Sequence, residues 1–461
     1  MAMGVRKDRQ EALFVTADEL PRSQGHPFYV KLNELLAEAG FDRWVERRCR
    51  QYYERQERRG RPSIPPGLYF RMLFVGYFEG LGSQRGIAWR CADSLSLRTF
   101  LGVPLHESTP DHSTLTNTRQ RLPPEVFEEV FQFVLRIALE KGLLSGQTVG
   151  VDSTLLEADA AMKSIVRRDT GEDWKAYVTR LMQAEGLVEA EERPTDEELR
   201  RYDKQRRPKK VSNEEWVSQT DPESCIAQLK DGRTHLAYKT EHVVDLESDL
   251  LLTAEVLPAT AADTETFVDS VMQAQLHLQA AGSETQIEEA AADKAYHADA
   301  TLELSAALNL RTYIPEPKRR HRRRWTDKPP AFHAAVVNNR RRVRRAKSKR
   351  LQRPRSERCE RSFAHLCDSG GMRRTWLHGL VDTTKRYVIA AAAHNLGRIL
   401  RKLFGVGKPK ALQGEGGLAG LAQLLTLRVM ALLALLTRSW LAPQLHLAPR
   451  RDAQPTRGYA A

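Results

Sequence analysis

The sequence predicts a mixed α/β protein in which an all-α N-terminal domain precedes a mixed β-sheet flanked by helices. From about residue 27 to 147, apolar residues recur at three- and four-residue spacing, which is the helical period. At Thr148 the pattern changes to the continuous apolar run of a buried strand. Strand-like and helical segments then alternate, as is typical of a sheet with helices on its faces.

The helical period of the N-terminal domain is clearest in residues 28–41 and 65–81. Residues 109–114 form a turn and N-cap cluster, after which a helix is expected from Leu115. Pro123 and Pro124 end that helix, and a second, long helix follows. Such helix–turn–helix units sometimes bind DNA, but plain helical packing is their commoner meaning. Residues 1–26 are expected to be a flexible N-terminus.

The second half of the chain is expected to begin with a strand that ends near residue 156. A highly charged insertion follows at 158–223, with helical fragments and a basic knot at 204–210. Two strands at 235–245 and 250–257, joined by a turn, predict an antiparallel hairpin. The remaining elements are expected to be a helix at 263–281, a weak strand at 287–293, a helix at 300–307, a strand at 311–315 and helices from about 357.

Most of the positive charge lies in one stretch. The chain carries a net charge of +13, which suggests a polyanionic partner, either nucleic acid or an anionic membrane. Residues 318–355 hold 17 Lys or Arg and one acid, so this stretch carries +16 and the remainder of the chain −3. A charge run is usually a solvated linker. Trp325, Phe332 and several valines are interleaved here, which favours a helix packed on another part of the protein.

The cysteines and the apolar segments exclude other classes of protein. The five cysteines are scattered without a CxxC pair, so neither a zinc site nor a disulfide framework is indicated, and a reducing cytoplasm fits. The N-terminus has no apolar signal core. The most apolar stretch, 418–436, is broken by Gln423 and Arg428, which favours a buried or amphipathic helix over a membrane span. A C-terminal helix and tail are expected over 406–461.

Three acids follow strands or lie on a helix in positions that call for a partner. Asp152 lies at the carboxyl end of the first predicted strand, where a carboxylate is costly unless it is paired, hydrated or bound to metal. Asp293 ends a later predicted strand. For both aspartates, a turn or helix-cap role is the structural alternative. Glu360 lies on a predicted helix and shares a mainly apolar face with Phe363 and Cys367, so it is expected to point at the sheet.

Motifs around these acids resemble insertion-sequence DDE transposases. The motifs are VGVDSTLLEA (149–158), SIVRRDTGE (164–172), TDPES (220–224), KDGRTHLAYKTEHVVD (230–245), DKAYH (293–297), ERSFAH (360–365), GGMRRTWL (370–377) and NLGRILRKL (395–403). RMLFVGYFEGL (71–81) and PDHSTL (110–115) resemble the helical domain ahead of such catalytic cores. The resemblance covers about residues 27 to 410. It implies a helical DNA-binding domain at 27–147 and an RNase H-like catalytic domain at 148–405, which includes the insertion and the Arg-rich segment 318–355.

The resemblance also implies a catalytic site. Asp152, Asp293 and Glu360 match the first, second and third acids of the family, and Glu357 is the runner-up for the third. These acids would hold two Mg²⁺ or Mn²⁺ ions, which prefer oxygen ligands. The ions would activate a water or a DNA 3′-hydroxyl for in-line attack and stabilise the departing 3′-oxygen.

The implied partners are double-stranded DNA at the transposon ends and the target. A homodimer on DNA is expected because two ends must be brought together, and the expected location is a bacterial cytoplasm, at the nucleoid. Expected DNA contacts, or groups just behind the acids, are Lys294, Tyr296 and Arg361. Arg-rich segments are expected to neutralise phosphates without reading sequence, and a helix of the N-terminal domain to read the ends. The arginines in question are Arg340, Arg341, Arg344 and Arg345.

This chain departs from the family pattern at three positions. Ala295 stands where many relatives have Gly, which would cost about 1 kcal/mol if the turn required a left-handed backbone. Ser153 also replaces a frequent Gly, and Cys367 stands where related enzymes often carry a Lys.

Other residues and other functions remain as alternatives. His112 and His365 are expected to have capping or core roles. Asp245 is expected to open the hairpin turn and Asp263 to cap a helix. An RNase H-like nuclease without strand transfer uses the same chemistry. A non-catalytic nucleic-acid-binding protein, or decayed transposase, is the third possibility.

Overall fold

The computed structural model describes residues 26–53, 63–189, 191–205, 212–318, 323, 325–326 and 328–409. The chain up to Val406 forms one compact unit. The expected flexible N-terminus, most of the basic knot and the C-terminal helix and tail lie outside the described residues. None of the helices in the described ranges combines the length and the apolar composition that a membrane span needs.

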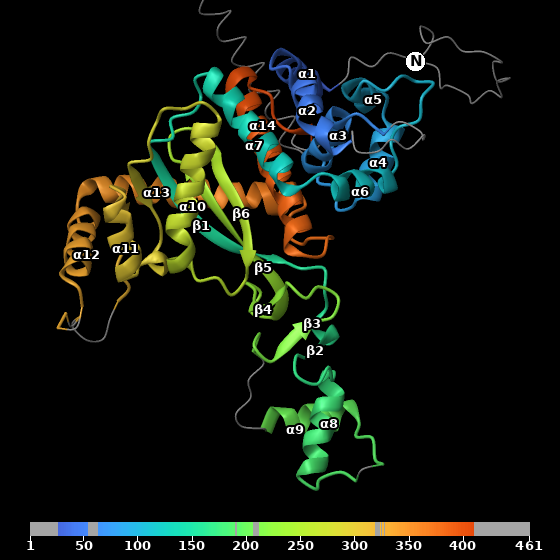
Figure 1. Ribbon diagram of the computed structural model, residues 1–461, viewed down its shortest axis with the longest axis vertical. Coiled ribbons are helices and arrows are strands. Elements are labelled where there is room, and N and C mark those ends of the chain that lie inside the picture. Colours follow the sequence, from blue (N-terminus) through green and yellow to red (C-terminus); the bar gives the residue numbers. More distant parts are fainter. Residues whose placement is uncertain are drawn as a thin grey trace, which may run out of the picture. The chain divides into compact units, whose positions relative to one another are not determined.

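The N-terminal region is helical, as expected (Figure 1). Proline stands in the first turn of three of its helices, where the missing N–H costs nothing. Asp111 caps a fourth helix by accepting a hydrogen bond from the Thr114 N–H at 2.8 Å. The elements are α1 (Pro27–Glu38), α2 (Phe41–Cys49), η1 (Arg50–Tyr52), α3 (Pro66–Phe78), α4 (Gln84–Asp93), α5 (Leu95–Leu101), α6 (His112–Arg121) and α7 (Pro124–Glu140).

A mixed sheet follows, which confirms the α/β prediction. Its central path runs β4-β5-β1-β7-β8, and β6 pairs with β5. β5 is antiparallel to β1, β4 and β6, whereas β7 is parallel to both β1 and β8. The strands are β1 (Thr148–Glu157), β4 (Cys225–Gln228), β5 (Thr234–Asp245), β6 (Leu251–Pro258), β7 (Glu289–Ala291) and β8 (Arg311–Tyr313). The predicted hairpin is β5–β6.

Helices cover both faces of this sheet. Asp152 on β1 pairs with Arg355 of α13, whereas the next residue, Ser153, bonds to Asp263 of α10. Because successive strand residues point to opposite faces, α10 and α13 lie on opposite faces of β1. α14 packs against β6 and against the N-terminal helices α3 and α7. These elements are α10 (Asp263–Ala280), η3 (Lys294–Tyr296), α11 (Asp299–Ala307), α12 (Pro330–Val343), α13 (Ala346–Ala364), η4 (His365–Ser369) and α14 (Leu380–Phe404).

The expected insertion contains more regular structure than helical fragments. β2 (Ile165–Arg167) and β3 (Trp216–Ser218) form a separate two-stranded sheet. Between them lie α8 (Trp174–Ala184) and α9 (Asp196–Gln205), whose contact is a small apolar cluster of Val178, Met182 and Leu199.

The Arg-rich segment is largely helical, so a solvated linker is the wrong interpretation for its described residues. α12 spans Pro330–Val343, and α13 begins at Ala346, about eleven residues before the expected start near Glu357. α13 also contains Pro354. An interior proline normally ends or kinks a helix. Here the helix continues past Pro354, and the buried side chains of Arg355 and Cys359 pack its next turn against the protein.

Candidate active site

The pairing of β1 with β7 brings two of the predicted acids together. Gly150 pairs with Ala291 in parallel register, and this is the last pair of the two strands. Asp152 and Asp293 each lie two residues beyond it. β1 continues beside β5 to Glu157, so the expectation that Asp152 ends its strand is wrong, whereas Asp293 does follow the end of β7. Adjacent strands are about 4.8 Å apart, so the shared register still gives the two acids neighbouring positions. Burial is the main cause of the raised pKa of Asp152, and the negative charge of Asp293 adds to it.

Asp152 is largely buried, and its charge is balanced by an arginine. Burial raises the pKa of Asp152, while Arg355 opposes that rise. Arg355 Nη2 lies 3.3 Å from Asp152 Oδ1, and its Nε donates to the Val151 carbonyl at 3.2 Å. Arg355 is 7% exposed. Sequence reasoning counted this residue only as one basic charge among many, and no local pattern marks it as the partner of Asp152.

Glu360 lines the same cleft as Asp152. This cleft has a volume of about 910 Å³, and its wall includes Phe363 and Cys367. The expectation that Glu360 points at the sheet is wrong. Cys359, Ser362 and Leu366 form the buried stripe, and Glu360 is exposed beside it. Its carboxylate therefore faces the cleft that Asp152 also lines, whereas Asp293 is not part of the cleft wall.

The alternative third acid, Glu357, has a different environment. It contacts Arg361, four residues on, and Arg361 Nη1 also donates to Asp249 Oδ2 at 2.9 Å. Asp249 lies in the turn between β5 and β6. Glu357 is not part of the wall of the cleft that contains Asp152. Of the two glutamates, Glu360 is the one that shares a cleft with Asp152.

The chemistry of these acids fits a hard divalent cation. Three carboxylates supply the oxygen ligands that Mg²⁺ prefers. A dication held by Asp152 and Asp293 would relieve the repulsion between their negative charges. In the structure, the positive charge of Arg355 stabilises the Asp152 carboxylate. Across the ranges that the structure describes, no three His, Cys, Asp or Glu side chains are close enough to hold a metal ion. Binding would thus require these side chains to converge.

Asp263 has a different role from the one expected. The N-cap of α10 is Ala262, and no side chain caps this helix. Instead, Asp263 Oδ1 accepts a hydrogen bond from Ser153 Oγ at 2.9 Å and lies 2.7 Å from Lys239 Nζ. Asp263 and Lys239 also line the cleft. Sequence reasoning missed this pair because the contacts join residues that are far apart in the chain.

The three residues predicted to contact DNA beside the acids have different environments. Lys294 is exposed next to Asp293. Tyr296 is 1% exposed and donates to Glu241, so it fits a place behind the acids and not a direct DNA contact. Arg361 is engaged with Asp249 and Glu357.

The arginines of α12 and of the residues after it differ among themselves. Arg341, Arg344 and Arg345 are exposed. Arg340 instead pairs with Glu316 at 2.9 Å. The nearby helix α13 is tied to the site, because Gln352 donates to the Ala292 carbonyl at 3.1 Å. The exposed arginines lie on α12 and in the segment that leads into α13.

The departures from the family pattern cause no visible backbone strain. Positive φ angles among the described non-glycine residues occur at Asp249 and Asn309, so Ala295 needs no left-handed backbone. Ser153 gains a hydrogen bond to Asp263. Cys367 lines the cleft, and burial raises the pKa of its thiol to about 11.

The remaining alternatives have structural roles. Asp245 accepts hydrogen bonds from the Glu247 and Ser248 N–H groups, which confirms its place in the hairpin turn. His112 is the first residue of α6, and the helix is capped by its neighbour Asp111 and not by His112. The His365 ring packs against His394, with ring centroids 5.4 Å apart. All five cysteines are free.

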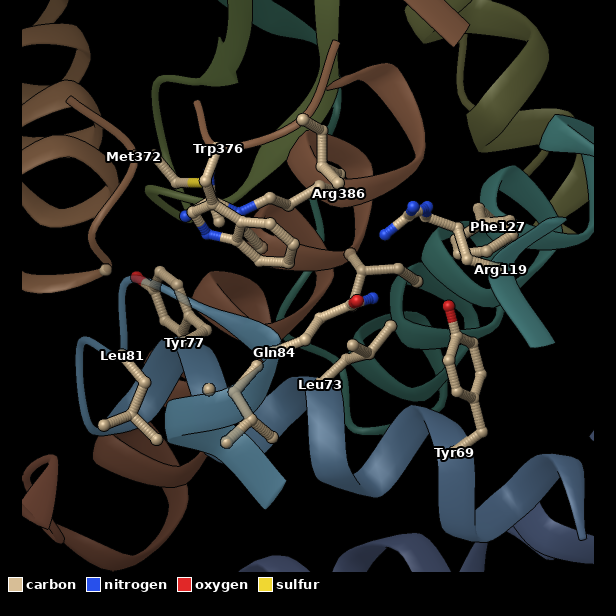
Figure 2. A pocket seen from close by; sticks show the side chains of 16 residues that line it. Tyr69, Leu73, Tyr77, Leu81, Gln84, Arg119, Phe127, Met372, Trp376 and Arg386 are labelled. Atoms are coloured by element: carbon tan, nitrogen blue, oxygen red, sulfur yellow. The ribbon is translucent and has the colours of Figure 1, made fainter. Parts of the chain in front are cut away.

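A smaller pocket lies between the N-terminal helices, the segment before α14 and α14 itself. Figure 2 shows its lining, in which Trp376 and Arg386 face Tyr77 and Arg119. The Arg386 guanidinium lies 4.5 Å from the Trp376 ring centroid and donates to the Gly371 carbonyl at 2.8 Å. The space of about 30 Å³ holds about one water molecule. We interpret this pocket as a small gap in the packing between these elements and not as a ligand site.

Comparison with known families assigns two parts of the chain. Residues 16–121 match the family described as Transposase domain (DUF772), and residues 316–400 match the family described as Transposase DDE domain. The first match covers α1 to α6, and the second covers the Arg-rich helices, Glu360 and most of α14. Searches of curated proteins and of solved structures gave no match.

The two matches indicate a transposase, an enzyme that processes DNA. They agree with the insertion-sequence transposases of the DDE type, the family that the sequence motifs resemble.

Proposed function

We propose that this chain cleaves and joins DNA at the ends of an insertion sequence, with two Mg²⁺ or Mn²⁺ ions held by Asp152, Asp293 and Glu360. One observation carries the proposal. The register of β1 and β7 aligns Asp152 with Asp293, and Glu360 on α13 lines the cleft that contains Asp152. Asp152 and Glu360 line one open cleft, and Asp293 lies beside Asp152 through the strand register. Three carboxylates so arranged are the main protein contribution that two-metal phosphoryl transfer requires.

The strand arrangement supports an RNase H-like core. In the order β6-β5-β1-β7-β8, the first three strands are antiparallel and the last two continue parallel to β1. The insertion interrupts this core after its first strand. We propose domain boundaries of 27–147 for the helical domain and 148–405 for the catalytic domain, with the insertion at 158–223 and the Arg-rich segment at 318–355.

The residues of the site would divide the work as follows. The bound ions would supply Lewis-acid activation of the attacking oxygen and stabilisation of the leaving 3′-oxygen. Asp152 and Asp293 hold their positions through the strand register, and Glu360 closes the cleft from the helix. Lys294 is exposed beside Asp293, where an ammonium can contact a phosphate.

DNA would approach along the Arg-rich helices. Arg341, Arg344 and Arg345 are exposed, and α13 is tied to the residue before Asp293 through Gln352. Arginines there neutralise phosphates without reading bases. The N-terminal helices would recognise the ends, and two subunits would bring two ends together. The site of action would be the DNA of a bacterial cytoplasm.

The test uses DNA that carries the short inverted repeats flanking the reading frame. With Mg²⁺ or Mn²⁺, the protein should nick the strand at the repeat end and form joined products on a denaturing gel. Cleavage without joined products would assign a nuclease instead. Binding without cleavage, and without stabilisation by either metal, would assign a non-catalytic DNA-binding protein.

A further inference from the structure

Lys239 on β5 is a buried lysine at the centre of a polar network. Its Nζ lies 2.7 Å from Asp263 Oδ1, 3.0 Å from Glu241 Oε2 and 2.9 Å from Thr266 Oγ1. Its side chain is 5% exposed, and that of Glu241 is fully buried. The ammonium donates to Thr266 and is paired with two carboxylates, so its charge is balanced inside the protein. Lys239 therefore lines the cleft as part of this network, and its charge is already engaged.

One arm of this network reaches the residue after Asp152. Asp263 accepts a hydrogen bond from Ser153 Oγ at 2.9 Å, and the Ser153 N–H donates to Asp152 Oδ1 at 3.0 Å. This part of β1 lies beyond Gly150, the last residue paired with β7. The hydrogen bond from Ser153 to Asp263 thus holds β1 at a point where its backbone no longer pairs with β7.

The other arm reaches the turn that carries Asp293. Tyr296 Oη donates to Glu241 Oε2 at 3.0 Å. Tyr296 belongs to η3, whose N-cap is Asp293, and Asp293 Oδ1 accepts from the Ala295 N–H at 2.8 Å. Because η3 is a single turn, fixing Tyr296 fixes the backbone at Asp293.

We infer that Lys239 is a positioning residue that sets the separation of the Asp152 and Asp293 carboxylates. It links Ser153 through Asp263 and Tyr296 through Glu241. Without the ammonium, Asp263 and Glu241 would repel each other, and the two arms would separate. This inference rests on the proposed function, because the separation matters for holding divalent ions.

The direct test replaces the lysine by an uncharged side chain of similar length, Lys239→Met. We expect the Mn²⁺ concentration at half-maximal binding, followed by electron paramagnetic resonance without DNA, to rise about 10- to 100-fold, the usual effect of removing a group that orients metal ligands. The Mn²⁺ midpoint for cleavage should rise in parallel. A loss of folded protein would lower the amplitude of both signals and leave both midpoints unchanged.

Lys385→Met is the matched control. Lys385 on α14 is also buried, and its Nζ donates to the Arg119 carbonyl at 3.1 Å, outside the cleft. Its removal should leave the Mn²⁺ midpoints unchanged.

Two further variants keep the test decisive if Lys239→Met does not fold. The double variant Lys239→Met/Glu241→Gln removes both members of the charge pair. Tyr296→Phe removes the hydrogen bond from Tyr296 to Glu241 and leaves every buried charge in place. Both should raise the Mn²⁺ midpoint. If the unaltered protein binds Mn²⁺ and a folded variant shows the same midpoint, the role of Lys239 is refuted and the proposed function stands. No Mn²⁺ binding by the unaltered protein would contradict the proposed function itself.

Discussion

Glu360 and Glu357 lie three residues apart on α13 and differ in what they face. Glu360 lines the cleft with Asp152, whereas Glu357 contacts Arg361. The structure therefore offers a matched pair of substitutions on one helix. Both glutamates are exposed, so neither substitution should affect folding much.

Glu360→Gln should reduce metal-dependent strand cleavage by at least about 100-fold, because the amide removes a negative ligand from a site that works by charge neutralisation. Glu357→Gln should change it by less than about threefold, as expected for an exposed ion pair. Single-turnover cleavage rates at saturating DNA measure both. The reverse ranking would move the third acid to Glu357.

At the scale of elements, α13 lies close against β1 at a glycine. A Cβ on Gly150 would lie 2.8 Å from Leu246 Cδ2 and 3.1 Å from Arg355 Cγ. Gly150→Ala should therefore push α13 outward and destabilise the protein by about 1–3 kcal/mol, the usual cost of overpacking. Urea unfolding measures this change. Gly82→Ala is the control, since nothing lies within 4 Å of its added Cβ. An equal loss of stability in the two variants would show that close packing at Gly150 is not the cause.

His242 ties β5 to the C-terminal helices. Its ring contacts Ser362 Oγ and Tyr387 Oη, each at 2.8 Å, and stacks on Phe363. Burial lowers the pKa of His242 to about 3, so it stays neutral in the folded state and gains a proton on unfolding in weak acid. Stability should fall as the pH drops from about 6.5 towards 3, by up to about 1.4 kcal/mol per pH unit from this residue.

The pH dependence of urea unfolding in His242→Gln checks that contribution. The variant keeps a polar group at the position but cannot titrate, so its stability should fall less steeply over this range. Curves with the same slope for variant and unaltered protein would show that His242 contributes nothing to the acid sensitivity.

The elements differ in how well the sequence predicts them. β1, the β5–β6 hairpin and α10 each hold enough residues for a period to be read, and they occur where expected. β2 and β3 were not predicted, because each is three residues long and lies within the highly charged insertion. The start of α13 was missed because Pro354 is locally a helix breaker, and tertiary packing overrides it. The Lys239–Asp263 pair depends on contacts between β5 and α10 that no local pattern reports.

At the scale of the whole molecule, the central question is where the positive charge meets DNA. Arg344 and Arg345 are exposed in the segment between α12 and α13, and Arg200 and Arg201 are exposed on α9 of the insertion. If the Arg-rich layer holds DNA, Arg344→Ala/Arg345→Ala should reduce the slope of log K against log salt by up to about 1.8, or about 0.9 per lost phosphate contact.

Fluorescence anisotropy at several salt concentrations measures this slope. The variant Arg200→Ala/Arg201→Ala removes the same charge from the insertion and should leave the slope near its original value. A larger change in this control would place the DNA path along the insertion instead.

Asp152 and Asp293 must act together on metal and DNA if this protein is a DDE transposase. The most direct measurement is strand cleavage of inverted-repeat DNA in Mg²⁺ by Asp152→Asn and Asp293→Asn, with DNA binding measured on the same preparations. We expect both variants to bind DNA as the unaltered protein does and to lose cleavage. Full cleavage by either variant would contradict the assignment of these two acids to the catalytic site.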